Sequence, residues 1–201
     1  MSGRLRIIGG RWRGRKIVVT DRPGLRPTGD RARETLFNWL QDRVPGATAL
    51  DLFAGTGALG LEAASRGAAR VVLVERDAAL AAALERARAE WPGADALEIA
   101  RADARAWLAN ADGPFDLAFV DPPFDSGLHA PTLEALARPG LLAGDARVYV
   151  ESPARAAAPV AEDGADWRIV RDKCVGEVRM QLLAPVRTDR PEPGLPPIPG
   201  A

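Results

Sequence analysis

Short apolar runs alternate with longer amphipathic stretches from residue 48 onward. The short runs are rich in Val, Ile and Leu, which predicts buried strands. The longer stretches repeat apolar positions every three or four residues, as Leu80 and Leu84 do in 77–91, which predicts helices. The predicted strands are 48–53, 70–75, 97–101, 115–121, 146–151, 167–172 and 175–183, and the predicted helices are 57–66, 77–91, 103–110 and 129–138.

This alternation predicts the fold class. Strands that alternate with helices of about ten to fifteen residues indicate βαβ units, and therefore a mostly parallel sheet with helices on both faces. The last two strands are joined by a turn at Gly176, so we expect them to form an antiparallel hairpin at the sheet edge. The chain is thus expected to be an α/β protein.

The first residues follow a different pattern. Residues 4–19 predict two short strands around the Gly9-Gly10 turn. A two-stranded ribbon is marginal by itself, so we expect this one to pack on the main domain. A helix is expected to begin near Thr28 or Asp30, since either side chain can cap its free amides, and Pro45-Gly46 should end it.

Three segments follow from these patterns. We expect a β-ribbon with its loop over 1–27 and the main domain over 28–184. Residues 185–201 hold six of the 17 prolines and almost no large apolar side chains. That composition predicts a disordered tail.

Length and composition exclude several classes of protein. The chain has 201 residues, 47% hydrophobic and 27% charged, which is typical of a globular domain that needs no disulfide or metal to fold. Its longest uncharged stretch, 52–61, is too short for a membrane-spanning helix, and MSGRLRI has no apolar signal core. A single cysteine, Cys174, excludes an intramolecular disulfide framework and a metal site built from several cysteines, and a single histidine, His129, excludes a His–His metal motif. We expect a cytoplasmic monomer with no membrane partner and no metal.

The formal net charge of zero hides an asymmetry. Residues 1–33 contain ten of the 27 Lys and Arg residues but only two acidic residues, so the rest of the chain is net acidic. Such a split favours a basic arm that contacts a polyanion over a merely solvated face.

The stretch 48–63 contains Gly55, Gly57 and Gly60 in the spacing G-x-G-x-x-G, between a predicted strand and a predicted helix. Small residues there let the backbone approach a cofactor. The motif alone fits either a dinucleotide or S-adenosylmethionine. Asp51 favours the second, because a carboxylate would repel a pyrophosphate but suits a cofactor with a sulfonium and an α-amino group.

Two further acidic residues follow the next two strands. Glu75 ends the strand 70–75, where a carboxylate can accept hydrogen bonds from both hydroxyls of a ribose. Asp103 can accept from an adenine amino group, with Ala104 supplying a backbone amide. An ordinary strand-end charge for Glu75 and a plain helix cap for Asp103 are the competing interpretations.

The apolar strand 115–121 ends in Asp121-Pro122-Pro123-Phe124. The two prolines remove amide donors, leaving carbonyls and a carboxylate as acceptors beside an aromatic ring. Such a turn is suited to an amino group on a planar ring. Hydrogen bonds from the amine to Asp121 and the Pro122 carbonyl would direct its lone pair at a methyl donor, and Phe124 could stack on the base.

RIIGGRWRGRKI, LRPTGDRARETLFNWL, DLFAGTGALGLEAASRGA, FVDPPF and YVES together resemble the RsmD-type 16S ribosomal RNA guanine-N2 methyltransferases. The resemblance covers residues 4 to about 183. It implies a Rossmann-like methyltransferase fold with strand order 3-2-1-4-5-7-6 and strand 7 antiparallel. It also implies S-adenosylmethionine as cofactor and ribosomal RNA, or an assembling small ribosomal subunit, as partner.

The expected site residues fall into three groups. Asp121, Pro122, Pro123 and Phe124 are expected to be catalytic; Asp51, Phe53, Gly55, Gly57, Glu75, Asp103 and Ala104 to bind the cofactor; and Arg4, Arg6, Arg11, Trp12, Arg13, Arg15, Lys16, Arg31 and Arg33 to bind RNA. For Trp12, stacking on a base and covering the domain are both open. Glu151 and Ser152 follow the fifth strand without an assigned role.

Other functions stay open on the sequence alone. A DNA adenine-N6 or cytosine-N4 methyltransferase shares the same turn, although 201 residues leave little room for a target-recognition segment. A noncatalytic RNA-binding assembly factor could keep the fold, but it would not need Asp51, Glu75 and Asp121 together. A dehydrogenase is disfavoured by Asp51 and by the proline turn.

Overall fold

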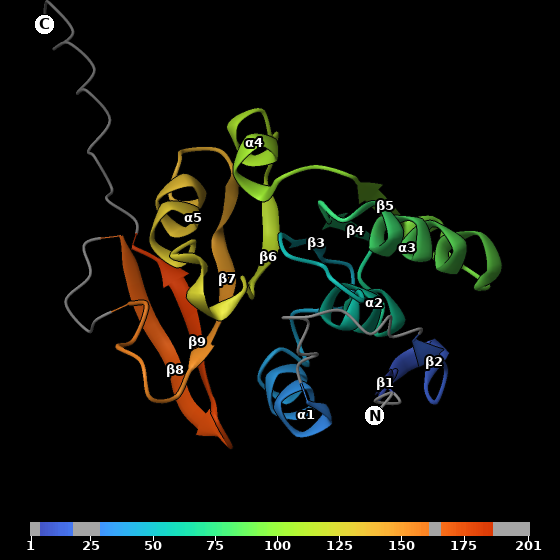
Figure 1. Ribbon diagram of the computed structural model, residues 1–201, viewed down its shortest axis with the longest axis horizontal. Helices are drawn as coiled ribbons and strands as arrows, with labels where there is room; N and C mark the ends of the chain where they lie inside the picture. Colours follow the sequence, from blue (N-terminus) through green and yellow to red (C-terminus); the bar gives the residue numbers. More distant parts are fainter. Residues whose placement is uncertain (1–4, 18–28, 161–165, 187–201) are drawn as a thin grey trace, which may run out of the picture.

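The computed structural model describes residues 5–17, 29–160 and 166–186. A seven-stranded sheet dominates it, and a separate two-stranded ribbon lies beside one end of that sheet (Figure 1). No helix among these residues has the length and apolarity needed to cross a bilayer. The predicted tail falls almost entirely outside the described residues.

The sheet is mostly parallel, and its α/β class is confirmed. Its strand order is β5-β4-β3-β6-β7-β9-β8, which reads 3-2-1-4-5-7-6 when counted from β3, the first strand of the sheet. Only β9 runs against the others, pairing antiparallel with both β7 and β8. The strands are β3 (Thr48–Asp51), β4 (Arg70–Val74), β5 (Leu97–Ala100), β6 (Phe115–Val120), β7 (Leu142–Pro153), β8 (Trp167–Val175) and β9 (Val178–Pro185).

In detail, β7 is longer than predicted. It begins four residues before the apolar run 146–151, and its pairing with β6 shifts register between Phe115 and Leu117. In this added segment Leu142 pairs with Phe115 of β6, whereas β9 pairs with β7 only from Val148 onward. The start of the strand therefore depends on contact with β6, which a hydrophobic pattern cannot reveal.

Helices cover both faces. Buried side chains of α1 (Asp30–Trp39), α2 (Ala58–Ser65) and α3 (Ala78–Glu90) belong to one apolar core, and those of α4 (Ala104–Ala109) and α5 (His129–Leu136) to the other. Successive strand residues such as Ala49 and Leu50 alternate between these cores, as the pleat requires. Figure 1 shows the two helical layers on opposite sides of the sheet.

Within residues 5–17 the ribbon is shorter than predicted. In this described part of it, only Leu5–Arg6 (β1) and Lys16–Ile17 (β2) pair, and a 3-10 turn, η1 (Gly10–Trp12), lies between them. Gly10 has a φ of 74°, and a Cβ there would overlap the carbonyl oxygen of Ser65 in α2. The turn therefore packs directly on α2, and only glycine fits at the contact.

The start of α1 also differs from the prediction. The N-cap is Gly29, with no side-chain cap, and Asp30 is the first helical residue. The Asp30 carboxylate instead receives a hydrogen bond from Arg33, one turn later, at 2.6 Å. Asp30 as a cap is therefore wrong, and Thr28 lies outside the described residues.

Candidate active site

The acidic residues predicted for the site all follow parallel strands at the same edge of the sheet. Asp51 ends β3, Glu75 follows β4, Asp103 comes shortly after β5 and Asp121 follows β6. Because β3 pairs with both β4 and β6, three of these carboxylates lie at adjacent strand ends. Crevices at this edge are where open α/β sheets bind ligands.

The glycines of the loop after β3 have different structural roles. Gly55 and Gly57 have φ values of 55° and 81°, in the left-handed region that favours glycine. Gly57 is the N-cap of α2. A Cβ on Gly60 would lie 2.6 Å from Leu73, so this glycine lets α2 pack closely on β4. Two of the three glycines therefore shape the turn and the third sets the distance between helix and sheet.

Asp51 is buried beneath this loop, with 2% of its surface exposed. Its Oδ2 accepts a hydrogen bond from the Gly60 amide at 2.9 Å. Burial, reinforced by the negative charge of Glu75, raises the pKa of Asp51 to about 7, against the opposing effect of backbone amides. A cationic group bound beside it would favour the carboxylate form.

Glu75 fastens the glycine loop, a role that the sequence did not suggest. Its two carboxylate oxygens accept hydrogen bonds from the amides of Gly55 and Asp77, each at 2.7 Å. Each oxygen carries a second lone pair, so contact with ribose hydroxyls is compatible with these bonds. Binding of a ribose stays a prediction for this residue.

Asp103 is an exposed helix cap, one of the two interpretations open from the sequence. Its Oδ1 accepts hydrogen bonds from the amides of Arg105 and Ala106, at 3.0 and 3.2 Å. Ala104, the first residue of α4, is buried. Phe53, in the loop after β3, is partly buried against the α4–α5 side of the sheet. Contacts of these three residues with a cofactor stay predictions.

The turn after β6 presents one polar and one aromatic side chain. Asp121 and Phe124 are half-buried, Pro122 is buried and Pro123 is exposed. The Pro123 carbonyl accepts a hydrogen bond from the backbone amide of Ser126, which closes a short 3-10 turn, η3 (Phe124–Ser126). The Phe124 side chain packs against the core formed with α1 and α2, and this contact holds one part of the ring.

A buried polar pair lies on the neighbouring strand, β7. The Tyr149 hydroxyl donates a hydrogen bond to Glu151 Oε2 at 2.8 Å, and Glu151 is only 3% exposed. Burial, the negative charges of Glu151 and Asp121, and that hydrogen bond raise the pKa of Tyr149 well above its ordinary value. The acidic Glu151, directly after the apolar residues 148–150, was the sequence signal for this pair.

The structure corrects two residues expected to bind RNA. Trp12 is 3% exposed; its indole N–H donates to the Pro92 carbonyl at 2.9 Å, and its ring meets Trp91 edge-on. Arg33 has no exposed surface. Neither side chain can contact RNA from these positions, so the expectation that Trp12 and Arg33 bind RNA is wrong. Trp12 instead covers the domain, the other role that the sequence left open for it.

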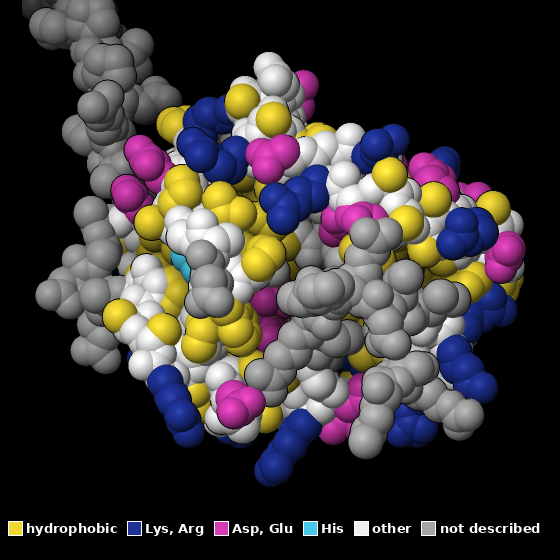
Figure 2. Space-filling view, viewed as in Figure 1, with side chains coloured by type: hydrophobic (Ala, Val, Ile, Leu, Met, Phe, Trp, Pro, Cys, Tyr) yellow, Lys and Arg dark blue, Asp and Glu magenta, His cyan; other side chains and the backbone are white. Residues whose placement is uncertain are grey.

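The other described cations of that set remain on the surface. The Arg11 guanidinium donates a hydrogen bond to the Ala64 carbonyl in α2, and it also lies over the ring of Trp12. In Figure 2, Lys and Arg side chains lie along the right margin near α3 and the ribbon, and others are scattered over the upper and the lower left parts of the same face. Arg4 lies outside the described residues. The exposed cations of the set are Arg6, Arg11, Arg13, Arg15, Lys16 and Arg31.

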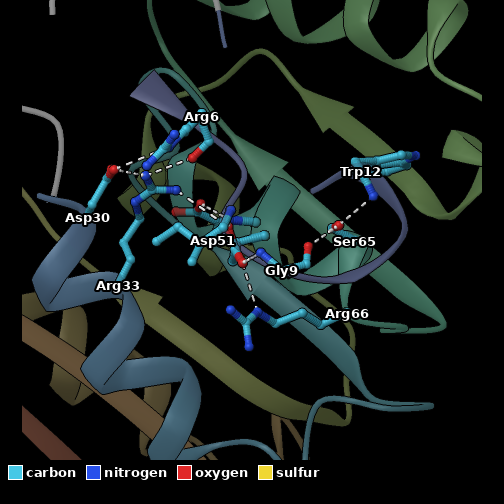
Figure 3. Close-up of polar contacts among 11 residues, drawn as sticks. Arg6, Gly9, Trp12, Asp30, Arg33, Asp51, Ser65 and Arg66 are labelled. Atoms are coloured by element: carbon cyan, nitrogen blue, oxygen red, sulfur yellow. Dashed lines mark hydrogen bonds and ion pairs between the residues drawn. The ribbon is translucent and has the colours of Figure 1, made fainter. Parts of the chain in front are cut away.

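Arg33 belongs to a buried network that joins the ribbon to α1 and α2 (Figure 3). At its centre is the fully buried Glu62 of α2, which accepts hydrogen bonds from the amides of Ile8 and Gly9 at 2.8 Å. Arg33 donates to Glu62 at 3.4 Å and to the Arg6 carbonyl at 2.8 Å. The ribbon is therefore fixed to the helix that begins at the glycine loop.

Comparisons with known proteins agree with this arrangement. The family described as Conserved hypothetical protein 95 matches residues 5–184. Ribosomal RNA small subunit methyltransferase D from Escherichia coli K12 is 46% identical over 181 residues, which are 90% of each chain.

Solved structures extend the likeness to the fold. The structure of yhhF from Escherichia coli has a TM-score of 0.82 and 43% identity, over 91% of this chain and 98% of that one. A protein from Haemophilus influenzae has a TM-score of 0.76 and 32% identity, over 92% and 100%. The chain therefore belongs to the family described as Conserved hypothetical protein 95, as an enzyme similar to ribosomal RNA small subunit methyltransferase D.

Proposed function

We propose that the protein transfers a methyl group from S-adenosylmethionine to the exocyclic N2 amine of a guanine in small-subunit ribosomal RNA. The observation that carries the proposal is the adjacency of β3 and β6. β3 leads into the glycine loop, and β6 leads into Asp121-Pro122-Pro123-Phe124. A loop suited to a methyl donor thus lies next to a turn suited to an amine. The ribosomal RNA methyltransferase relatives support the choice of RNA.

The residues at the carboxyl ends of β3, β4 and β5 fit such a cofactor. Asp51, buried and with a raised pKa, suits a bound cation. Glu75 and Asp103 would hold the ribose and the adenine. When bound, S-adenosylmethionine supplies an electrophilic methyl group on a sulfonium.

Asp121 would act on the acceptor. An amine on a purine is a poor nucleophile because its lone pair is delocalised into the ring. By accepting a hydrogen bond from the amine, the Asp121 carboxylate would localise that lone pair on nitrogen and align it with the methyl group. Asp121 would then take the proton that the methylated amine loses. Phe124 would hold the plane of the base by stacking.

The exposed cations of the ribbon and Arg31 would neutralise RNA phosphates. The chain after residue 33 is net acidic, so this basic surface would supply most of the long-range attraction.

Methylation in vitro tests the proposal. The purified protein would be incubated with labelled S-adenosylmethionine and unmodified small-subunit RNA, either free or as an assembled particle. Mass spectrometry of the nucleosides should find N2-methylguanosine. Methylated adenine or cytosine in a DNA substrate, with no product in RNA, would favour the DNA methyltransferase instead.

A further inference from the structure

A second carboxylate lies beside Asp121 at the same edge of the sheet. β6 and β7 are parallel, and Val120 pairs with Val150. Asp121 directly follows Val120, and Glu151 directly follows Val150, so the two acidic residues come next along these neighbouring strands. Alternate residues of a strand share a face, and Phe119 and Tyr149, two positions earlier, both lie in the core under α1 and α2. Asp121 and Glu151 are therefore directed to the same face.

Glu151 is held rigidly at this place. The Tyr149 hydroxyl donates to its Oε2 at 2.8 Å, and the backbone carbonyl of Glu151 lies 2.7 Å from His129 Nε2 at the start of α5. The Tyr149 ring is fully buried, so it has no freedom to withdraw its hydroxyl. Glu151 is therefore held both through its side chain, by Tyr149, and through its backbone, by His129.

Glu151 is buried next to another acidic residue. Charges interact more strongly away from bulk water, so two carboxylates placed in this way can stabilise a nearby positive charge. The charges of Glu151 and Asp121 each raise the pKa of Tyr149. Both acidic groups therefore lie close enough to the Tyr149 hydroxyl to interact with it.

The proposed reaction creates positive charge in that region. As the bond between nitrogen and the methyl carbon forms, the bond between that carbon and sulfur breaks, and its electron pair stays on sulfur. The positive charge passes to the amine nitrogen, which then loses one proton to Asp121. Nothing is oxidised or reduced, and the negative groups nearby favour the charge-shifted transition state over the neutral amine.

We propose that Glu151, positioned by Tyr149, supplies a second negative charge beside Asp121 that stabilises the cation developing on the acceptor amine. The proposal rests on the proposed function above. Glu151 acts through its charge and Tyr149 acts through Glu151.

Two substitutions of Glu151 separate charge from shape. Glu151→Gln keeps the size and the acceptor for Tyr149 but removes the charge, whereas Glu151→Asp keeps the charge in a shorter side chain. We expect the single-turnover rate, at saturating RNA and S-adenosylmethionine, to fall about 10- to 100-fold in Glu151→Gln. Glu151→Asp should be faster than Glu151→Gln, and calorimetry should show cofactor affinity within about twofold of wild type in both.

Tyr149→Phe is the second variant, since it removes one hydroxyl and keeps the buried ring. It should slow the reaction less than Glu151→Gln, and the double variant should be no slower than Glu151→Gln alone. Asp116→Asn is the matched control. Asp116 lies at the opposite end of β6 from Asp121, and it accepts a hydrogen bond from the Thr48 amide at 2.8 Å. The Asp116→Asn variant should therefore react at the rate of wild type.

A merely structural Glu151 gives the reverse order, with the shorter Asp slower than the isosteric Gln. That order, or a wild-type rate in Glu151→Gln, would overturn the proposal. If the wild type methylates an amine other than guanine N2, the proposed substrate is wrong. In that case the rates of wild type, Glu151→Gln and Glu151→Asp on the other amine are compared in the same way, and their order still tests the role of Glu151.

Discussion

Single carboxylates at this sheet edge have a structural role besides the chemical role proposed for them. Glu75 and Asp51 accept hydrogen bonds from backbone amides of the glycine loop and its helix. The sequence pointed to both residues as cofactor ligands because of their type and their distance from the glycines. It could not show that they also hold the loop, because those contacts depend on the exact course of the backbone.

Asp121 gives the most direct prediction at this scale. We expect Asp121→Ala to lower the methyl-transfer rate at least about 100-fold while cofactor binding stays nearly intact, because the hydrogen bond that alanine cannot accept is strongest in the transition state. Asp121→Asn should retain more activity, since its amide oxygen still accepts a hydrogen bond. Single-turnover assays and titration calorimetry on both variants check this, and a wild-type rate in Asp121→Ala would contradict the role.

Asp51 makes stability depend on pH. Its pKa rises from 3.8 to about 7 on folding, so the folded protein binds this proton more tightly than the unfolded chain. The stabilisation is complete below about pH 4 and is lost as the pH rises to about 7, a change of the order of 4 kcal/mol. We expect Asp51→Asn, which still accepts from Gly60, to flatten that decline. Urea unfolding at about pH 4.5 and about pH 7.5 measures it; an equal decline in both proteins would refute it.

At the scale of elements, the hydrophobic pattern predicted every strand of the sheet and the helices between them. The pattern is local, because each strand or helix buries its own apolar side chains. The ribbon and its contact with α1 were harder to predict, since Trp12 and Arg33 each have a partner that is distant in the sequence. Trp12 is covered by residues near Pro92, and Arg33 pairs with Glu62 as well as with the nearby Asp30. A basic, aromatic segment therefore looked exposed until its partners were placed.

The Glu62 network should be worth more than any surface ion pair. Glu62→Ala leaves Arg33 buried with its charge only partly compensated and removes acceptors from two ribbon amides. We expect a loss of about 3–5 kcal/mol in the free energy of unfolding. Glu98→Ala is the control, because the Arg70–Glu98 pair has a similarly short contact, 2.7 Å, but is exposed; it should lose less than about 1 kcal/mol. Equal losses would show that burial adds nothing.

At the scale of the whole molecule, the exposed cations of the ribbon lie at one end of the sheet. The basic ribbon lies at the end of the sheet near β4 and α3, whereas β8 forms the opposite edge (Figure 1). Because the ribbon is fixed to α2, the cations are presented at a set distance from the glycine loop. A free arm would reach many places, but a fixed one can orient RNA relative to the site.

The salt dependence of RNA binding tests that arrangement. We expect RNA affinity to fall steeply with salt, by about 0.7 in the log–log slope for each phosphate neutralised on a single strand. Changing the exposed Arg13, Arg15 and Lys16 to Ala should therefore flatten the slope by about two if all three contact phosphate. None of the three belongs to the residues expected to hold the cofactor, so affinity for S-adenosylmethionine should not change. The matched control replaces three exposed cations of β8, Arg168, Arg171 and Lys173, with no expected effect on the slope. Filter binding at several salt concentrations distinguishes the variants. A slope that flattens only in the β8 variant would place the RNA on the other edge of the sheet and make the ribbon a structural cover.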